Sequence, residues 1–559
     1  MVVKILRYLQ KEFNGLHEAA FLLGIFALLS QIIAIVRDRL FAGYFGAGLE
    51  LDIYYAAFRI PDIIFVSIAS FVAITVIMPF FIERIEKDKK DAQRFINSIF
   101  TIFFVVIVLV SIAMYFLIPS LVEKTMGFDE AARQQVVSFA RILLLSPILL
   151  GISNIFASIT QAFRNFLVYA LSPVMYNIGI IIGLLVFYPA FGLVGLMYGV
   201  ILGALLHLCI QLPVVISHGF FPRFSISIPF RDVKNVVFLA LPRTLGLSAQ
   251  QIALFILVAI ASTMIAGSVA VFQFAFNLQS VPLSVIGVSY SVAAFPTLAR
   301  LYSKNQTKKF VHQVITAMRH IIFWSLPILV LFVILRAQIV RTILGVGEFD
   351  WEDTRLTAAI LAIFAVSIVA QSLILILVRG YYAAGKTKIP VIVNVLSAGL
   401  IIILAYVFNT IFSEVTSMRY FFESLLRIED IPGSNVLALP AAYSAGMIVN
   451  ILVLWRLFKR DFGISRCDSL RKTFRHSLYS AFMMGTVAYY LLDIFDDVFD
   501  LNTFVGVFSQ GLMAGIGGIV FGIILLKAMR NEEIEEIQKV LKHKFWRSKT
   551  ILPDKVDLT

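Results

Sequence analysis

The chain has 559 residues, of which 60% are hydrophobic and only 14% are charged, and its mean hydropathy is +0.91. These values exclude a soluble globular domain and indicate an integral membrane protein. The net charge of +13 would suit a nucleic-acid partner in a soluble protein, but in a membrane protein the placement of basic residues matters more than their sum. Cys209 lies in an apolar segment and Cys467 in a predicted loop, so we expect no disulfide.

Fourteen apolar segments are long enough to cross a membrane, because a spanning helix needs about 20 apolar residues. No small-residue cleavage site follows the first segment, so we expect a retained helix and not a signal peptide. The fold class is therefore an all-α integral membrane protein. The predicted spans are residues 18–36, 53–82, 95–118, 137–158, 168–188, 192–216, 236–265, 268–296, 312–335, 357–382, 389–412, 435–458, 476–493 and 504–527.

Basic residues are distributed unequally between alternate loops. The loops after even-numbered spans contain 23 Lys and Arg residues, whereas the loops after odd-numbered spans contain 9. By the positive-inside rule, the more basic loops are cytoplasmic. Both termini are then cytoplasmic as well, and the loop between the first two spans faces the outer side.

Landmarks at one spacing indicate an internal duplication. Pro79 and Pro296 lie near the ends of the second and eighth spans and are 217 residues apart, and the same spacing separates PVMYN at 173–177 from PVIVN at 390–394. Duplicated halves are common in transporters. We expect two parallel six-helix lobes around a central cavity, followed by two added helices. The predicted parts are a cytoplasmic segment at 1–17, an N-lobe at 18–216, a C-lobe at 217–458, helices 13 and 14 at 459–527 and a cytoplasmic tail at 528–559.

Patterns for catalysis are missing from the sequence. The seven histidines are scattered, and there is no HExxH, CxxC, GxSxG or Walker A pattern. We therefore expect a transporter without its own ATPase, with no catalytic residue, no bound metal and no cofactor. The coupling ion is left open.

Charged and amide side chains within the apolar segments are the candidate site. A charged side chain inside a membrane has a high free-energy cost, so it usually has a function in binding or transport. Each charge could instead mark the membrane interface, and each amide could join neighbouring helices. The candidates for the substrate cavity are Arg37, Asp38, Ser30, Gln31, Asp52, Arg59, Gln273 and Asn277, and Asn394 is a further candidate in the eleventh span.

Two motifs resemble those of the MurJ/MviN lipid II flippase family, which belongs to the multidrug/oligosaccharidyl-lipid/polysaccharide exporter superfamily. The first is RDxxxAxxFGAGxxxDxxxxAFRIPD, from Arg37 to Asp62, and the second is VPLSVIGVSYSVAAFPTLAR at 281–300. The resemblance implies fourteen helices and a central cationic cavity for a diphosphate and sugar head group. It also implies transport of undecaprenyl-diphosphate-linked peptidoglycan precursor from the cytoplasmic to the outer leaflet, with a groove for the polyprenyl tail.

The chain departs from the family at most of the expected cavity cations. Alignment on the motifs retains the outer arginine of the first helix as Arg37, but places Gln31, Phe65 and Asn277 where the family has arginines and Ser70 where it has a glutamate. Because guanidinium is the preferred partner of a diphosphate, a tight diphosphate clamp of the family type is not expected. Asn394 is followed one turn later by Ala398, so the family's Asn and Asp sodium pair is also incomplete.

The leading hypothesis is a flippase for a polyprenyl-diphosphate-linked glycan, with lipid II first among the cargoes, in the bacterial cytoplasmic membrane. Three alternatives stay open: a flippase for another lipid-linked oligosaccharide or polysaccharide, a cation-coupled exporter of small amphipathic compounds, and a scaffold that recruits cell-wall enzymes. The expected partners are the lipid-linked precursor and membrane lipids, with cell-wall synthesis proteins as further candidates and no nucleic acid.

Overall fold

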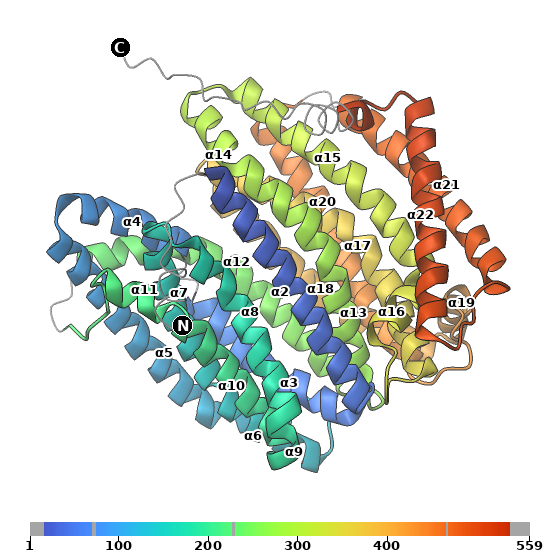
Figure 1. Cartoon of the computed structure of the whole chain (residues 1–559), viewed down its shortest axis with the longest axis horizontal. Coiled ribbons are helices and arrows are strands. Elements are labelled where there is room, and N and C mark those ends of the chain that lie inside the picture. Colours follow the sequence, from blue (N-terminus) through green and yellow to red (C-terminus); the bar gives the residue numbers. More distant parts are fainter. Residues whose placement is uncertain (1–15, 70–73, 226–229, 465–467, 537–559) are drawn as a thin grey trace, which may run out of the picture. The chain divides into compact units, whose positions relative to one another are not determined.

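A computed structural model describes residues 16–69, 74–225, 230–464 and 468–536, and every regular element in these ranges is a helix (Figure 1). Twelve helices there are long and apolar enough to cross a membrane, and they coincide with the third to the fourteenth predicted spans. The prediction of an all-helical membrane protein is thus confirmed. The first two predicted spans lie on α2 and on α3 with α4, which are not among the twelve. Ser70 and Cys467 lie outside the described residues.

The helices of the first half follow one another with short connections. They are α2 (Leu16–Phe45), α3 (Leu49–Ile64), the π-helical turn η1 (Phe65–Ala69), α4 (Ile74–Lys87), α5 (Lys89–Thr125), α6 (Glu130–Leu143), α7 (Leu145–Ala162), α8 (Phe166–Ile182), the π-helical turn η2 (Gly183–Phe187), α9 (Tyr188–Phe191), α10 (Leu193–Cys209), α11 (Leu212–Ser217) and α12 (Phe230–Ala261).

The second half continues in the same manner. Its elements are α13 (Ser268–Pro282), the π-helical turn η3 (Leu283–Val288), α14 (Ser289–Ser303), α15 (Thr307–Ile334), α16 (Arg336–Leu344), α17 (Trp351–Ala383), α18 (Lys388–Glu414), α19 (Thr416–Leu426), the 3₁₀ turn η4 (Ser434–Leu437), α20 (Ala438–Asp461), α21 (Asp468–Asp496) and α22 (Phe504–Ala528).

Several predicted boundaries were wrong because charged residues and prolines do not end these helices. α2 continues to Phe45, so Arg37 and Asp38 lie within the helix and not at its end. The chain turns instead at Gly46, whose φ of +58° lies in the left-handed region that favours glycine. Pro79 and Pro296 lie inside α4 and α14, beyond which both helices continue. A helix can continue past a buried charge when neighbouring groups satisfy that charge.

Contacts divide the molecule into two compact units, which do not coincide with the two predicted lobes. The first unit holds the described residues up to Val281 together with Val340–Ser367 and Gly385–Leu454, and the second holds the remaining described residues. α17 and α20 run from one unit into the other. All candidate site residues belong to the first unit.

In the first unit, α8 with η2 packs closely against α10 through facing glycines. A Cβ atom on Gly199 would lie 2.3 Å from the Cα atom of Gly183, and one on Gly179 would lie 2.2 Å from the Cα atom of Gly203. Such close backbone approach is typical of membrane helices joined through small residues.

Gly199→Val is expected to force α8 and α10 apart, because a real Cβ atom cannot occupy the space beside Gly183. Overpacking of this kind costs about 1–3 kcal/mol or more. The thermal unfolding midpoint of the purified protein should fall clearly. Gly399→Val is the matched control, because no atom lies within 4 Å of the added Cβ position; an equal loss in both variants would contradict the close packing.

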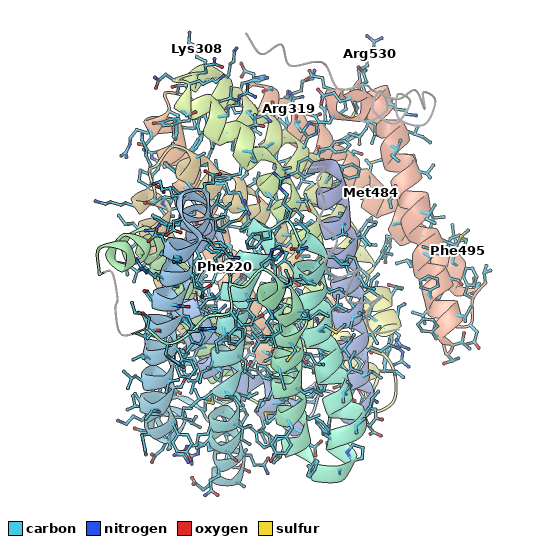
Figure 2. All side chains as sticks on the ribbon, turned by 60° about the vertical axis from the view of Figure 1, so that its left-hand side comes forward. Phe220, Lys308, Arg319, Met484, Phe495 and Arg530 are labelled. Atoms are coloured by element: carbon cyan, nitrogen blue, oxygen red, sulfur yellow. The ribbon has the colours of Figure 1, made fainter. Side chains whose placement is uncertain are left out.

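In the second unit, α21 and α22 lie side by side and α21 packs on α15 (Figure 1). Lys308, Arg319 and Arg530 lie toward one end of this unit, and Phe495 lies toward the other (Figure 2). At the basic end, Arg319 of α15 contacts the segment that follows α22. Its Nε atom donates to Glu533 at 2.7 Å and its Nη2 atom donates to Glu532 at 2.6 Å.

Glu533 is buried, and burial alone would raise its pKa. Hydrogen bonds from Thr473, at 2.6 Å, and from Arg319 outweigh that effect and hold the pKa of Glu533 below its ordinary value of 4.5. Because the folded-state pKa is lowered, this contact stabilises the fold fully above about pH 4.5 and loses its effect as the pH falls further.

Glu533→Gln is therefore expected to loosen residues 531–536, since it leaves the half-buried Arg319 guanidinium with Glu532 as its remaining carboxylate. Breaking a buried ion pair costs about 3 kcal/mol. The hydrogen-exchange protection factors of this segment, which are corrected for the intrinsic pH dependence of exchange, should fall in the variant, and in the unmodified protein they should fall as the pH drops below 4.5. Glu535→Gln, at an exposed position, should change neither.

Candidate functional site

Six side chains from α2, α3, α8 and α13 form one continuous hydrogen-bonded chain, which we call the polar chain: Asn177, Arg37, Asp38, Asn277, Gln273 and Arg59. Arg37 donates from Nη2 and Nε to the Oδ1 atom of Asp38, at 2.7 and 3.0 Å, and from Nη1 to Asn177 at 2.9 Å. Asn277 donates to Asp38 Oδ2 at 2.9 Å. Gln273 donates to Asn277 at 2.7 Å and accepts from Arg59.

The polar chain borders a cavity of about 130 Å³ inside the first unit. Its lining consists of Arg37, Tyr54, Tyr55, Phe58, Arg59, Asp62, Tyr176, Ile180, Gln273 and Asn277. Two buried atoms at the cavity lack a hydrogen-bond partner, Arg59 Nε and the Tyr55 hydroxyl. Unsatisfied buried polar groups are costly, so their presence on a cavity wall favours a ligand that bears acceptor oxygens.

Two guanidinium groups therefore reach this cavity, one from α2 and one from α3. Arg37 and Arg59 both belong to the first motif, from Arg37 to Asp62, and both line the cavity. Asn277 stands on the cavity wall as an amide that bonds the carboxylate of Asp38. The absence of arginine at Gln31, Phe65 and Asn277 stays as predicted from the alignment, and Arg37 and Arg59 are the two guanidinium groups that line this cavity.

A set of contacts joins several helix ends of this unit, and we call it the end layer. It joins Ala47 in the α2–α3 turn and Asp52 in the first turn of α3 to the starts of α17 and α13, respectively. Asp52 is fully buried and accepts hydrogen bonds from the backbone N–H groups of Gly267 and Ala270, both at 2.7 Å. The N–H of Ala47 donates to Asp353 at 3.0 Å.

Further members of the end layer come from α2, α16 and the α5–α6 loop. Arg39 donates to the carbonyl oxygens of Thr342 and Ile343, at 2.6 and 3.0 Å. The N–H of Gly127 donates to Ser262 at 2.9 Å. A carboxylate on free N–H groups at a helix start stabilises that start. Asp52 thus fixes the beginning of α13 against α3, and the predicted outer loops meet there.

Five sequence-predicted residues are not among those that line the cavity: Asp38, which belongs to the polar chain, Asp52, which belongs to the end layer, and Ser30, Gln31 and Asn394. Ser30 and Gln31 lie on α2 about two turns before Arg37 and are not among the lining residues. Asn394 of α18 accepts a hydrogen bond from Asn450 of α20 at 3.0 Å, so its amide joins two helices. For Asn394 the interpretation as interhelical contact is the one that this geometry supports.

Sequence reasoning missed the aromatic part of the lining and one member of the polar chain. Tyr55 precedes Arg59 by four residues on α3 and therefore shares its face. Tyr176 and Asn177 lie together in the repeated PVMYN segment. The signal for Tyr55 was its place in the first motif, and the signal for Tyr176 and Asn177 was their place in the repeated PVMYN segment. A tyrosine in an apolar segment does not by itself indicate a site.

Among the described residues, no group of three or more His, Cys, Asp or Glu side chains could hold a metal ion. The chemistry of the cavity is that of paired guanidinium, carboxylate and amide groups. Such a set binds and orients anionic or hydroxyl-rich head groups. It contains no nucleophile with an activating base.

Helices that enclose a charged cavity within a membrane are typical of transporters, and the fold supports that class. An inward-facing MATE family multidrug transporter of the MOP superfamily aligns with a TM-score of 0.61 and 17% identity, over 79% of this chain and 96% of that chain. A lipid II flippase MurJ in an inward closed conformation aligns with a TM-score of 0.72 and 22% identity, over 91% of this chain and 100% of that chain.

Sequence comparison gives the family. The family model described as lipid II flippase MurJ matches residues 41–508. A probable lipid II flippase MurJ from Rhizobium tropici is 30% identical over 376 residues, which cover 65% of this chain and 69% of the relative. The chain therefore belongs to the lipid II flippase MurJ family: it is a multi-pass membrane transporter and not an enzyme.

Proposed function

We propose that this chain carries lipid II from the inner to the outer leaflet of the bacterial cytoplasmic membrane by alternating access. The observation that carries the proposal is the polar chain, in which two guanidinium groups meet at one cavity inside the membrane protein. Arginine is the preferred partner for a diphosphate because it donates in a planar, bidentate manner. Family membership supports lipid II as the cargo.

The size of the cavity supports a step in which the protein must open to bind. Ligand sites for small molecules usually measure about 300–1,000 Å³, whereas this cavity measures 130 Å³. A glycan head group cannot enter until the surrounding helices separate. On opening, diphosphate oxygens would take the place of Asp38 and Gln273 as acceptors for Arg37 and Arg59.

The end layer supports a transport cycle in which the cargo enters from the cytoplasmic side and leaves on the outer side. Its loops follow odd-numbered predicted spans, which we place on the outer side because they carry few basic residues. Closure there would leave the cytoplasmic side as the route for loading. Rupture of the Asp52 contacts would then open the outer side and release the cargo.

The proposed topology has fourteen spans with both termini in the cytoplasm. We assign residues 18–216 and 217–458 to two parallel six-helix lobes and residues 459–527 to helices 13 and 14. The spacing of 217 residues between PVMYN and PVIVN supports this duplication. The segments 1–17 and 528–559 are proposed to be cytoplasmic.

The test is to supply this chain in a bacterium whose own lipid II flippase is depleted, and to label lipid II on the outer leaflet. Restored labelling and growth would support the proposal. Unrestored labelling at normal membrane abundance would contradict it. Restored export of another lipid-linked glycan in its place would favour the alternative cargo.

A further inference from the structure

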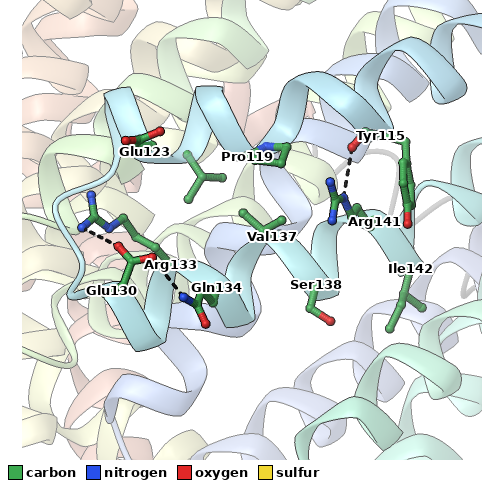
Figure 3. A pocket seen from close by; sticks show the side chains of 11 residues that line it. Tyr115, Pro119, Glu123, Glu130, Arg133, Gln134, Val137, Ser138, Arg141 and Ile142 are labelled. Carbon is green, nitrogen blue, oxygen red and sulfur yellow. Dashed lines mark hydrogen bonds and ion pairs between the residues drawn. The ribbon is translucent and has the colours of Figure 1, made fainter.

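A second groove lies between the last turns of α5 and the length of α6, apart from the polar chain (Figure 3). Its volume is about 690 Å³, and both charged and apolar residues line it. Arg133 and Glu130 lie at one end of the groove, and Arg141 and Tyr115 lie at the other (Figure 3). Nothing in the proposed transport cycle uses these residues.

An apolar slot of about 330 Å³ continues from this groove. The two hollows share Tyr115 and Arg141, and the slot is lined otherwise by side chains such as Ile112, Phe116, Leu144, Leu145 and Ile148. The slot lies along a surface of exposed apolar side chains, among them Leu109, Ile112, Phe116 and Leu145. Such a surface on a spanning helix faces lipid tails.

The polar part of the groove carries both signs of charge. Arg133 pairs with Glu130 at 3.0 Å on the α6 wall, and Glu123 lies on the α5 wall without an ion pair among the described residues. Arg141 donates from Nε to the carbonyl oxygen of Tyr115 at 3.0 Å, and its guanidinium lies 4.4 Å from the Tyr115 ring centroid. This contact orients Arg141, and no carboxylate within the described ranges lies at ion-pair distance from it.

Two buried polar atoms on these walls have no hydrogen-bond partner: Nε of Arg133 in the groove and Oγ of Ser111 in the slot. Unpartnered buried donors are uncommon in proteins and are usually explained by an absent ligand or water. They point to an occupant that reaches both hollows and offers acceptor oxygens.

We propose that this groove and slot bind one phospholipid with a zwitterionic, amine-bearing head group such as phosphoethanolamine. The phosphate lies beside Arg133, the ammonium group lies near Glu123 and Glu130, the glycerol ester oxygens face Arg141 at the other end of the groove, and one acyl chain occupies the apolar slot. Guanidinium groups bind phosphate strongly, and paired carboxylates suit an ammonium group. In the proposed topology the site faces the outer leaflet, away from the side on which lipid II loads.

The charges that line the groove favour a zwitterionic lipid head group over an anionic one. A purely anionic lipid would place its negative charge near Glu123, which forms no ion pair among the described residues, whereas an ammonium group supplies a cation in the groove. A peptide or soluble protein would not account for the slot, which opens along the lipid-facing side of α5. The occupant is therefore a membrane lipid of the same bilayer.

Native mass spectrometry of the full-length purified protein tests the site, with titration by phosphatidylethanolamine or by phosphatidylglycerol of the same acyl chains. We expect the unmodified chain to bind one phosphatidylethanolamine in preference to phosphatidylglycerol. Arg141→Gln should weaken this binding about tenfold, because it removes a charge-assisted contact to the ester oxygens of the lipid. Glu123→Gln should retain binding but lose the preference for the amine-bearing lipid.

Two further variants keep the result interpretable. Ser138→Trp fills the groove from an exposed position without changing any charge, and it should abolish the preferred lipid. Lys124→Gln is the matched control, since Lys124 neighbours Glu123, is exposed and does not line the groove. Equal binding of both lipids by the unmodified chain would overturn the zwitterionic assignment. Unchanged binding in Ser138→Trp and Arg141→Gln together would overturn the site.

Discussion

Replacement of Arg37 by Ala is expected to reduce lipid II on the outer leaflet to the level of cells without a functional flippase. Arg37 makes three hydrogen bonds at the cavity, two to Asp38 and one to Asn177. Its loss removes one of two guanidinium groups available to a diphosphate and leaves the buried Asp38 carboxylate uncompensated, which alone costs about 3–5 kcal/mol. Outer-leaflet labelling at matched membrane abundance is the measurement.

A double variant separates transport from stability. Arg37→Leu with Asp38→Leu removes both charges, and replacing a buried ion pair by apolar residues is often neutral for stability. We expect normal abundance and a normal unfolding midpoint, but still no transport. Transport by the double variant would show that the pair only holds α2 in place. Arg94→Ala, at an exposed position on α5, is the matched control and should transport normally.

Charge patterning predicted the core of the site because membrane-embedded charge is rare and therefore informative. Five predicted residues belong to the polar chain: Arg37, Asp38, Arg59, Gln273 and Asn277. The first three are separated from the last two by more than 200 residues along the sequence. The gathering of polar side chains in the first and eighth predicted spans was the signal that associated α2 with α13. Asp52 was predicted for the cavity, but it lies in the end layer instead.

The remainder could not be predicted because it depends on three-dimensional packing. Whether an amide in an apolar helix bonds a neighbouring helix, as Asn394 does, or lines a cavity depends on helix rotation, which hydropathy does not specify. Helix ends were misplaced for a related reason. The loss of hydropathy at Arg37 marks the membrane interface in an isolated helix, but here Asp38 and Asn177 satisfy the charge and α2 continues.

Replacement of Asp52 by Ala is expected to open the outer side of the cavity. The Asp52 carboxylate satisfies two buried N–H groups at the start of α13, and a hydrogen bond to a charged group contributes about 1.5–3 kcal/mol. Losing about 3 kcal/mol would shift the equilibrium between closed and open forms about 100-fold. Asp52→Asn keeps one acceptor atom and should have an intermediate effect.

Labelling of a cysteine from outside the cell measures this opening. Ile180→Cys places a thiol on the cavity wall, in a chain whose own Cys209 and Cys467 are replaced by Ser. A membrane-impermeant thiol reagent should label this position slowly with Asp52 intact, faster with Asp52→Asn and fastest with Asp52→Ala. Asp430→Asn is the control, because Asp430 forms an exposed ion pair with Arg355, at 2.7 Å, outside the end layer. Equal labelling in all four proteins would mean that the Asp52 contacts do not hold the outer side closed, and the proposed direction of the cycle would then lose its support.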